Sequence, residues 1–331
     1  MLQEALELLA CPRCQGALEP PLLSCSRCGA RYPLEEGIAG VRLAGDARTE
    51  AVRGFYAQAP FPAYPPRDSY GWLRARAERS EFARLLDRAI PGDARVLEVG
   101  CGTGQMSLFL ATADRLVIGA DLARPSLELA ESARRRYGID RAVFVETDLR
   151  APGLRPFAFD VVYSSGVLHH TPDPRASFAA IVRLVRPGGM LVLGLYNAYA
   201  RLPHRLRRGV ARLTGFRWFP GDPVLRERRA EPARREAWLR DQYRHVEEHR
   251  HTLREVQGWF RENGVEYVRA YPDTQLAAEP LREDGLFRAV DDDWGFENLL
   301  AQLSWARTLA HEGGLFVVVG RTARERARAV S

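Results

Sequence analysis

From residue 95 onward, short apolar segments alternate with longer stretches whose apolar residues recur every three or four positions. The short segments have the length of buried strands, and the longer ones have the period of amphipathic helices. This alternation predicts an α/β fold with a doubly wound parallel sheet, which binds ligands at the carboxyl ends of its strands. The predicted strands are 96–99, 116–120, 142–145, 160–164, 190–195, 265–271 and 314–320, and the predicted helices are 105–113, 125–137, 174–185 and 253–263.

Three segments lie outside this alternation. The apolar residues of 72–89 fall on one helical face and predict a single helix. The segment 55–66 holds four prolines and four aromatic residues, so we expect an extended chain that packs on another part of the protein. A third segment predicts an amphipathic helix, because apolar residues recur at helical spacing among arginines. These apolar residues are Leu202, Leu206, Val210 and Leu213.

The 331 residues suffice for about two domains and a sizeable core. The pattern divides them into a core, a small cysteine-rich domain at the N-terminus, and additions to the core. The predicted parts are a cysteine-rich domain at 1–44, an aromatic and proline segment with a helix at 45–90, a core at 91–200 and 250–325, an arginine-rich cap at 201–249, and a second cap at 273–307.

The charged residues exclude several chemistries. The sequence contains no lysine, so all 48 basic side chains are arginine, and the net charge is +6. A P-loop lysine, a lysine nucleophile and a pyridoxal Schiff base are therefore excluded. Arginine stays charged and binds anions. No apolar run reaches the roughly 18 residues that a membrane span needs, and the N-terminus, with Glu4 and Glu7, does not resemble a signal peptide.

Four of the five cysteines form two C-x2-C pairs, Cys11 with Cys14 and Cys25 with Cys28. Four thiolates at this spacing close a tetrahedral zinc site, and the pairing favours a reducing cytoplasm over disulfides. A site with four protein ligands has no open position for a substrate. We therefore expect one structural zinc.

The sequence around these cysteine pairs resembles the Trm112-like zinc-ribbon family, in particular at residues 8–12 and 32–38. In that family the ribbon accompanies methyltransferases as a partner or activator. The resemblance covers residues 1 to about 44 and implies a zinc ribbon.

A glycine-rich turn follows the first predicted strand of the core. Gly100, Gly102 and Gly104 follow the G-x-G-x-G spacing, at a place where the backbone lets a ligand approach closely. A dinucleotide fingerprint requires its third glycine at position 105, which is glutamine here. At the end of the next strand, Asp121 can accept hydrogen bonds from two ribose hydroxyls. The turn and the acid together predict a nucleoside site.

The segment 98–104 resembles motif I of class I S-adenosylmethionine-dependent methyltransferases, with a core of the methyltransferase type 11 kind. Four further motifs follow in order, at 120–122, 147–149, 159–170 and 184–193. The resemblance implies a Rossmann-like seven-stranded sheet with an antiparallel last strand, and S-adenosylmethionine as cofactor. Cys101 is interpreted as a small packing residue rather than a nucleophile. The implied cofactor residues are Glu98, Gly100, Cys101, Gly102, Gly104, Asp121, Leu122, Asp148, Leu149, Ser165 and Gly166.

Methyl transfer requires the acceptor to be aligned and one proton to be removed. His169 and His170 follow the fourth strand, near the expected position of the methyl group, and either could act as the base or only orient the acceptor. Tyr196 and Asn197 end the fifth strand and are predicted to face the same opening.

Aromatic and histidine side chains are candidates for binding the acceptor. The stretch 243–251 holds three histidines, and histidines four apart lie on one face of a helix. Such a helix could bind a metal or could simply be solvated. The predicted acceptor residues are Tyr56, Phe61, Tyr64, Tyr243, His245 and His249.

The segment from Arg201 to Arg240 contains twelve arginines and four acidic residues. It could be a lid that closes on an anionic small molecule, a surface that binds RNA phosphates, a helix that lies on anionic lipid, or a solvated helix.

We expect a cytoplasmic enzyme that methylates a small or lipid-like molecule, because the aromatic segment and the caps would enclose a pocket. An RNA methyltransferase, acting on rRNA or tRNA, is the alternative. A protein of another class would be a non-catalytic scaffold that holds a partner on its zinc ribbon.

Overall fold

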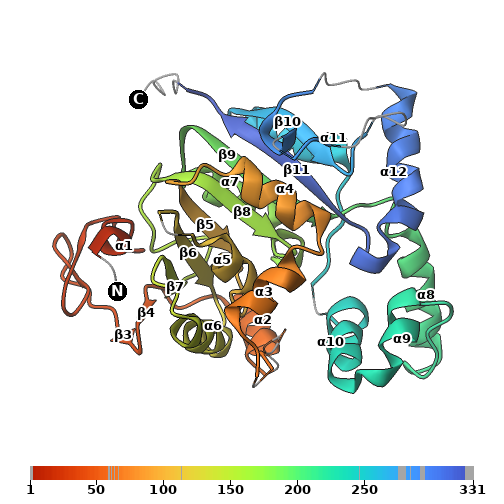
Figure 1. Ribbon diagram of the computed structural model, residues 1–331, viewed down its shortest axis with the longest axis horizontal. Coiled ribbons are helices and arrows are strands. Elements are labelled where there is room, and N and C mark those ends of the chain that lie inside the picture. Colours follow the sequence, from red (N-terminus) through yellow and green to blue (C-terminus); the bar gives the residue numbers. More distant parts are fainter. Residues whose placement is uncertain are drawn as a thin grey trace.

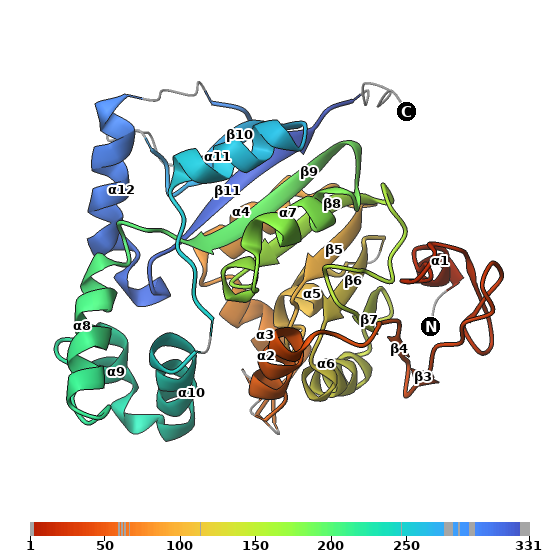
Figure 2. The same ribbon diagram turned by 180° about the vertical axis from the view of Figure 1, so that it is seen from behind.

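A nine-stranded sheet runs through the computed structural model (Figure 1). The structure describes residues 3–324, apart from 59, 61, 63, 66, 113, 246, 275–280, 284 and 291–294. The strand order across the sheet is β10-β11-β9-β8-β5-β6-β7-β4-β3. Figure 2 shows the opposite face of the same sheet.

Five neighbouring strands in the centre of the sheet are parallel, and β11 runs antiparallel between β9 and β10. Their residues are almost all buried, as expected for strands covered on both faces. These seven strands confirm the predicted α/β core with its antiparallel last strand. Their bounds are Arg95–Val99 for β5, Leu116–Asp121 for β6, Ala142–Glu146 for β7, Phe159–Ser165 for β8, Val185–Tyr196 for β9, Val265–Tyr271 for β10 and Leu315–Thr322 for β11.

Two apolar clusters cover the two faces of the sheet. One joins the strands to α3, α4, α5 and α6, and the other joins them to α7, α11 and α12. Figures 1 and 2 show the two layers in turn. The bounds of these helices are Tyr70–Ala77 for α3, Glu81–Ala89 for α4, Gln105–Leu110 for α5, Arg124–Tyr137 for α6, Pro174–Val182 for α7, Leu253–Glu262 for α11 and Phe296–Thr308 for α12, with a 3-10 turn Leu168–His170 between β8 and α7.

The N-terminal region supplies two of the nine strands. Strand β4 (Ile38–Gly40) pairs in parallel with β7, and β3 (Leu34–Glu35) pairs with β4. The amide of Ala10 also donates to the carbonyl of Gly153, and the amide of Arg155 to that of Leu8. This region therefore extends the core sheet instead of forming a separate body. It also contains α1 (Gln3–Glu7), β1 (Leu18–Glu19) and β2 (Ser24–Cys25).

Two predictions for the segment before the core are wrong. The stretch 72–89 is two helices, because the Ser80 side chain accepts from the amide of Ala83 and begins a new helix, α4. The stretch 55–66 is not extended throughout, since α2 (Ala47–Ala57) includes its first three residues. Asp46 caps that helix by accepting from Thr49.

The arginine-rich cap follows β9 and is helical. The predicted amphipathic helix is confirmed as α8 (Leu202–Leu213), followed by α9 (Pro223–Glu227), a 3-10 turn (Arg228–Ala230) and α10 (Pro232–Tyr243). The predicted helix through the three histidines is wrong, because α10 ends at Tyr243 and His251 instead pairs with Asn197 beside the sheet. Short 3-10 turns at Gly285–Phe287 and Ala310–Glu312 flank α12.

The predicted second cap, 273–307, lies partly outside the described residues, and its described part contains α12. None of the helices in the described part of the chain is both long enough and apolar enough to cross a membrane.

Candidate functional site

The four N-terminal cysteines converge on one point. Their Sγ atoms lie within 4.8 Å of one another, with 3.7 Å between Cys11 and Cys28 and 3.4 Å between Cys14 and Cys25. Zinc–sulfur bonds of about 2.3 Å in a tetrahedron place the sulfurs about 3.8 Å apart. The cluster is therefore compatible with zinc.

The backbone around the cluster also fits a metal site. A Cβ atom at Gly16 would lie 2.9 Å from Cys25 Sγ, so the turn can approach the sulfurs only because this residue is glycine. The hydroxyl of Tyr32 lies 3.1 Å from Cys11 Sγ and can donate to a thiolate there. Within the described residues, no other group of three or more His, Cys, Asp or Glu side chains is placed to hold a metal ion, so the histidines of 243–251 do not form a metal site.

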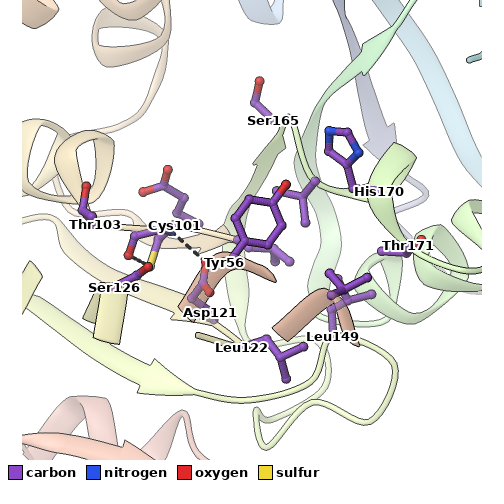
Figure 3. Close-up of a pocket in the computed structure, with 18 of the residues that line it drawn as sticks. Tyr56, Cys101, Thr103, Asp121, Leu122, Ser126, Leu149, Ser165, His170 and Thr171 are labelled. Atoms are coloured by element: carbon purple, nitrogen blue, oxygen red, sulfur yellow. Dashed lines mark hydrogen bonds between the residues drawn. The ribbon is translucent and has the colours of Figure 1, made fainter. Parts of the chain in front are cut away.

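A cavity of about 570 Å³ opens at the carboxyl edge of the parallel strands (Figure 3). It brings together ten of the eleven predicted cofactor residues with the α2 helix and the arginine-rich cap. The ten are Glu98, Gly100, Cys101, Gly102, Asp121, Leu122, Asp148, Leu149, Ser165 and Gly166.

Gly104 is the predicted cofactor residue that does not line this cavity. It begins α5 with a φ of 74°, and a Cβ atom there would lie 2.6 Å from the Phe144 ring. Gly104 therefore allows the helix to pack closely on the sheet. Gly100 lies on the cavity side of the same turn, where a Cβ atom would lie 2.2 Å from Val167.

Asp121 organises the glycine-rich turn. Its two carboxylate oxygens accept from the amides of Gly102 and Ala123, each at 2.8 Å. Burial raises the pKa of Asp121, and the backbone amides oppose that shift. Each carboxylate oxygen can accept a second hydrogen bond, so Asp121 can hold the turn and still bind hydroxyl groups in the cavity.

Glu98 is a second buried carboxyl group in the cavity wall. Burial raises its pKa to about 7, and the hydroxyl of Ser107, which donates to it, opposes the shift. Among the described residues no arginine forms an ion pair with it. Near neutral pH this carboxyl group can therefore switch charge. Cys101 stays a neutral thiol, because burial raises its pKa well above the ordinary value.

The loop after β7 carries Asp148 and Leu149 and is held from outside by the N-terminal region. Thr147 Oγ1 donates to the carbonyl of Val41 and accepts from the amide of Gly153. On the cavity side, the amide of Arg150 donates to Asp148 at 2.9 Å. The cysteine-rich region is thus connected by hydrogen bonds to a wall of the cavity.

His170 presents a neutral imidazole to the cavity. Its Nδ1 lies 2.7 Å from the backbone oxygen of Glu247, so Nδ1 carries the proton and donates. Burial lowers the pKa of His170 to about 4. Above that pH the Nε2 atom therefore has a free lone pair for an acceptor's proton.

His245 supports this side of the cavity from behind. Its ring lies 3.7 Å from the ring of His170, measured between centroids. Its Nδ1 accepts from the amide of Glu247, so its Nε2 carries the proton and donates to the hydroxyl of Tyr56, 3.0 Å away. One residue, Glu247, therefore orients both imidazoles, and Tyr56 lies in the cavity beside His170 (Figure 3).

The other three predicted catalytic residues lie behind the cavity wall. His169 is fully buried and stacks on the Tyr196 ring with centroids 3.8 Å apart. The hydroxyl of Tyr196 accepts from Gln242, and Asn197 Oδ1 accepts from the amides of Tyr199 and Ala200. These groups hold the end of β9 and the start of the cap in place.

The remaining predicted acceptor residues are dispersed. The hydroxyl of Tyr64 donates to the carbonyl of Thr103, so this hydrogen bond holds Tyr64 against the glycine-rich turn. Tyr243 donates to Asp222 inside the cap, and the amide of His249 donates to the carbonyl of His169. Phe61 lies outside the described residues.

Four cavity residues were missed because they come from the cap. They are Arg228, Ala237, Trp238 and Arg240. The Arg240 guanidinium lies over the Phe55 ring and donates to the Phe55 carbonyl, whereas Arg228 lies 5.3 Å from the centroid of the Trp238 ring. No local pattern marks these residues, since only the folding of the cap brings them to the cavity.

Comparison with known proteins identifies part of the chain. Residues 97–193 match the family model described as a methyltransferase domain. An uncharacterised protein of a Synechococcus strain is 28% identical over 252 residues, covering 67% of this chain and 60% of that protein. A ubiquinone biosynthesis O-methyltransferase of Bordetella avium is 36% identical over 125 residues, covering 36% of this chain and 49% of that enzyme. The chain thus spans about half to three fifths of these relatives.

Among solved structures, an S-adenosylmethionine-dependent methyltransferase from Mesorhizobium loti aligns over 74% of this chain and 99% of its own. The sequence identity is 20% and the TM-score 0.47.

If the four cysteines hold zinc, its loss should disturb the cavity as well as the cysteine-rich region. We expect Cys28→Ser to abolish zinc binding and to lower the free energy of unfolding by at least about 2 kcal/mol, since structural zinc contributes directly to folding. Amide exchange in 147–155 should accelerate, because its hydrogen bonds to Leu8, Ala10 and Val41 would weaken. Metal analysis and hydrogen-exchange mass spectrometry measure both effects.

Cys101→Ser is the matched control, since Cys101 lies outside the cluster. It should keep one zinc per chain. Unchanged exchange in 147–155 after zinc loss would show that the cysteine-rich region does not support the cavity.

Proposed function

We propose that this chain, whose residues 97–193 form a methyltransferase domain, is an S-adenosylmethionine-dependent methyltransferase that acts on a small or lipid-like acceptor and holds one structural zinc. One observation carries the proposal. A continuous cavity joins the glycine-rich turn and Asp121 to a wall of aromatic residues and His170. A nucleoside and an acceptor can therefore occupy adjoining parts of one space.

Asp121, Asp148, Leu122 and Leu149 are suited to the nucleoside part of S-adenosylmethionine. Asp121 would accept from ribose hydroxyls, and Asp148 from the adenine amino group. Leu122 and Leu149 offer apolar surface in the same region of the cavity (Figure 3). In its ionised form Glu98 would attract the positively charged part of the cofactor, because it lines the cavity without an arginine partner among the described residues.

When bound, S-adenosylmethionine supplies a methyl group already activated by its sulfonium. The residues of the chain therefore need only orient the acceptor and receive its proton. His170 is suited to this, since Glu247 fixes its tautomer and its Nε2 lone pair is available in the cavity wall. Its low pKa makes it a weak base, so we expect a rate contribution at the low end of general-base catalysis.

The acceptor side of the cavity favours an aromatic or apolar molecule. Phe55 and Tyr56 of α2 and Trp238 of α10 line the same cavity, and aromatic walls of this kind bind flat or apolar ligands. The relatives named O-methyltransferases support a hydroxyl group as the methylated site. Arg228 could bind an anionic substituent beside Trp238.

An RNA acceptor is less well supported, because key arginines of the cap bind within the protein. Arg201 and Arg208 both pair with Glu248, at 2.9 and 2.7 Å, and Arg240 donates to Phe55 and Gln58. These guanidinium groups are therefore not free to bind phosphates at the cavity.

The charge of Glu98 should control cofactor affinity. With a pKa of about 7, its ionised fraction rises about tenfold between pH 6 and pH 8. Because the pKa of Glu98 is raised, its carboxyl group is mostly neutral below neutral pH. Affinity for the cationic cofactor should therefore increase as the pH rises from 6 to 8. Calorimetric titration with S-adenosylmethionine at several pH values measures the change.

In Glu98→Gln this pH dependence should vanish and affinity at pH 8 should fall. A Glu98→Gln profile as steep as that of the wild type would assign the titration to another group.

The acceptor class can be tested with tritiated S-adenosylmethionine and cell extract separated into lipid, small-molecule, RNA and protein fractions. We expect label in the lipid or small-molecule fraction. With that fraction as substrate, His170→Gln should lower the rate by roughly a hundredfold, while cofactor affinity stays unchanged.

His249→Gln is the control, since the amide of His249 donates to the carbonyl of His169, beside His170, but His249 does not line the cavity. Label confined to RNA or protein, or an equal loss in both variants, would contradict the proposal.

A further inference from the structure

Helix α8 presents its apolar side chains to solvent. Leu202, Leu206 and Leu213 are 43%, 74% and 89% exposed. At 100° per residue these three leucines fall within about 40° of one another on the helix surface. The exposed stripe therefore runs along the full length of α8.

The opposite side of α8 packs on the protein with small and polar residues. His204 and Ala211 are buried there, and His204 Nε2 lies 2.9 Å from the carbonyl of Gln242. Arg208 pairs with Glu248 at 2.7 Å. The amphipathic pattern of α8 is thus inverted relative to an ordinary surface helix, whose apolar face covers the core. Its leucines contribute nothing to the core that the structure describes.

Cationic side chains border the apolar stripe. Arg205 and Arg212 are exposed on one flank of α8, and in the part of the chain that the structure describes neither has an acidic partner. After the helix, exposed Arg217 is followed by Trp218, which is 60% exposed. No acidic residue occurs between positions 202 and 221. The surface is both apolar and uniformly cationic.

A second helix on the same edge shows a similar stripe. Helix α12 lies along the same edge of the molecule as α8 in both views (Figures 1 and 2). Its Phe296, Leu299 and Leu303 are 73%, 38% and 43% exposed, while Ala301 and Trp305 are buried. The exposed apolar residues therefore extend over two helices.

We propose that α8 and Trp218 form a docking surface for an anionic phospholipid bilayer. Leucines along the centre of a helix, arginines on its flank and a tryptophan at its end match the chemistry of a membrane interface, where apolar groups enter the acyl boundary and guanidinium groups meet phosphates.

The charges of this surface favour a bilayer over a second copy of the chain and over RNA. A second copy of the chain would bring the arginine flanks of two α8 helices together, and like charges repel. RNA would pair with the arginines but would leave the leucines exposed to water. A bilayer engages both groups.

The proposal does not depend on the methyltransferase activity. It bears on the cavity because Arg228, Trp238 and Arg240 belong to the same cap as α8. Docking would therefore hold the cap, and with it one wall of the cavity, next to the lipid.

The test is flotation of the full-length protein with vesicles of phosphatidylglycerol and phosphatidylcholine, and with phosphatidylcholine alone. We expect binding to the anionic vesicles, weakening between about 0.05 M and about 0.5 M salt. Leu206→Glu with Leu213→Glu should reduce partitioning by at least about tenfold. Arg205→Gln with Arg212→Gln should reduce it about thirtyfold.

The matched control variants carry the same types of substitution at exposed residues outside α8. Leu22→Glu with Leu129→Glu alters two other exposed leucines, 60% and 36% accessible, and Arg79→Gln with Arg155→Gln removes two other exposed arginines. Circular dichroism and thermal melting check that every variant is folded. Both control pairs should bind vesicles as the wild type does.

Three results would overturn the proposal. The first is failure of the wild type to bind anionic vesicles at low salt. The second is vesicle binding by the α8 variants equal to that of their controls. The third is a dimer in sedimentation that Leu206→Glu with Leu213→Glu converts to a monomer, without any vesicle binding, which would assign the stripe to an interface between copies.

Discussion

The parallel hydrogen-bond ladder from β7 through β6, β5 and β8 to β9 is the constraint on which the site depends. Because these strands run in one direction, their carboxyl ends meet at one edge. Residues far apart in sequence then meet there: the glycine-rich turn after β5, Asp121 at the end of β6, Asp148 after β7 and His170 after β8. The amides of Gly100 and Cys101 both donate to the carbonyl of Ala120, so the ladder continues into the turn. The arrangement of these residues around the cavity thus follows from strand order.

The N-terminal region adds a second constraint at the open side of this ladder. Its strand β4 continues the parallel pairing from β7, with Gly40 opposite Glu146. The next residue, Val41, donates from its amide to the carbonyl of Glu146 and accepts from Thr147. A metal site that orders this region would therefore also order the loop that carries Asp148. The cysteine cluster lies outside the cavity, so an effect of a bound metal on ligand binding would have to pass through these hydrogen bonds.

The sequence predicted the core, and ten of the eleven residues assigned to the cofactor line one cavity, because each motif combines a local turn with the strand before it. Gly104 is the one assigned cofactor residue that does not line the cavity. A glycine is required there because of close contact with Phe144, which lies forty residues later in the sequence. The part of the cavity formed by α2 and the cap was much less predictable. Tyr56 meets His245, and Arg240 meets Phe55, across more than 180 residues, and neither contact leaves a periodic signal. His169 and His170 are adjacent in sequence, yet only His170 lines the cavity. The exposed leucines of α8 were predicted as a helical stripe, but their outward direction depends on His204 and Ala211, which pack inward.

Calorimetric titration with S-adenosylmethionine, comparing the wild type with Asp121→Asn, tests the account most directly. We predict that the wild type binds one cofactor and that Asp121→Asn weakens binding by at least about tenfold, as expected for losing hydrogen bonds to a carboxylate. Asp140→Asn, a change at an exposed acid, should bind as the wild type does, and equal melting temperatures would show that all three proteins are folded. Absence of binding by the wild type, or equal affinity in the two variants, would contradict the assignment of this edge of the sheet as the cofactor site.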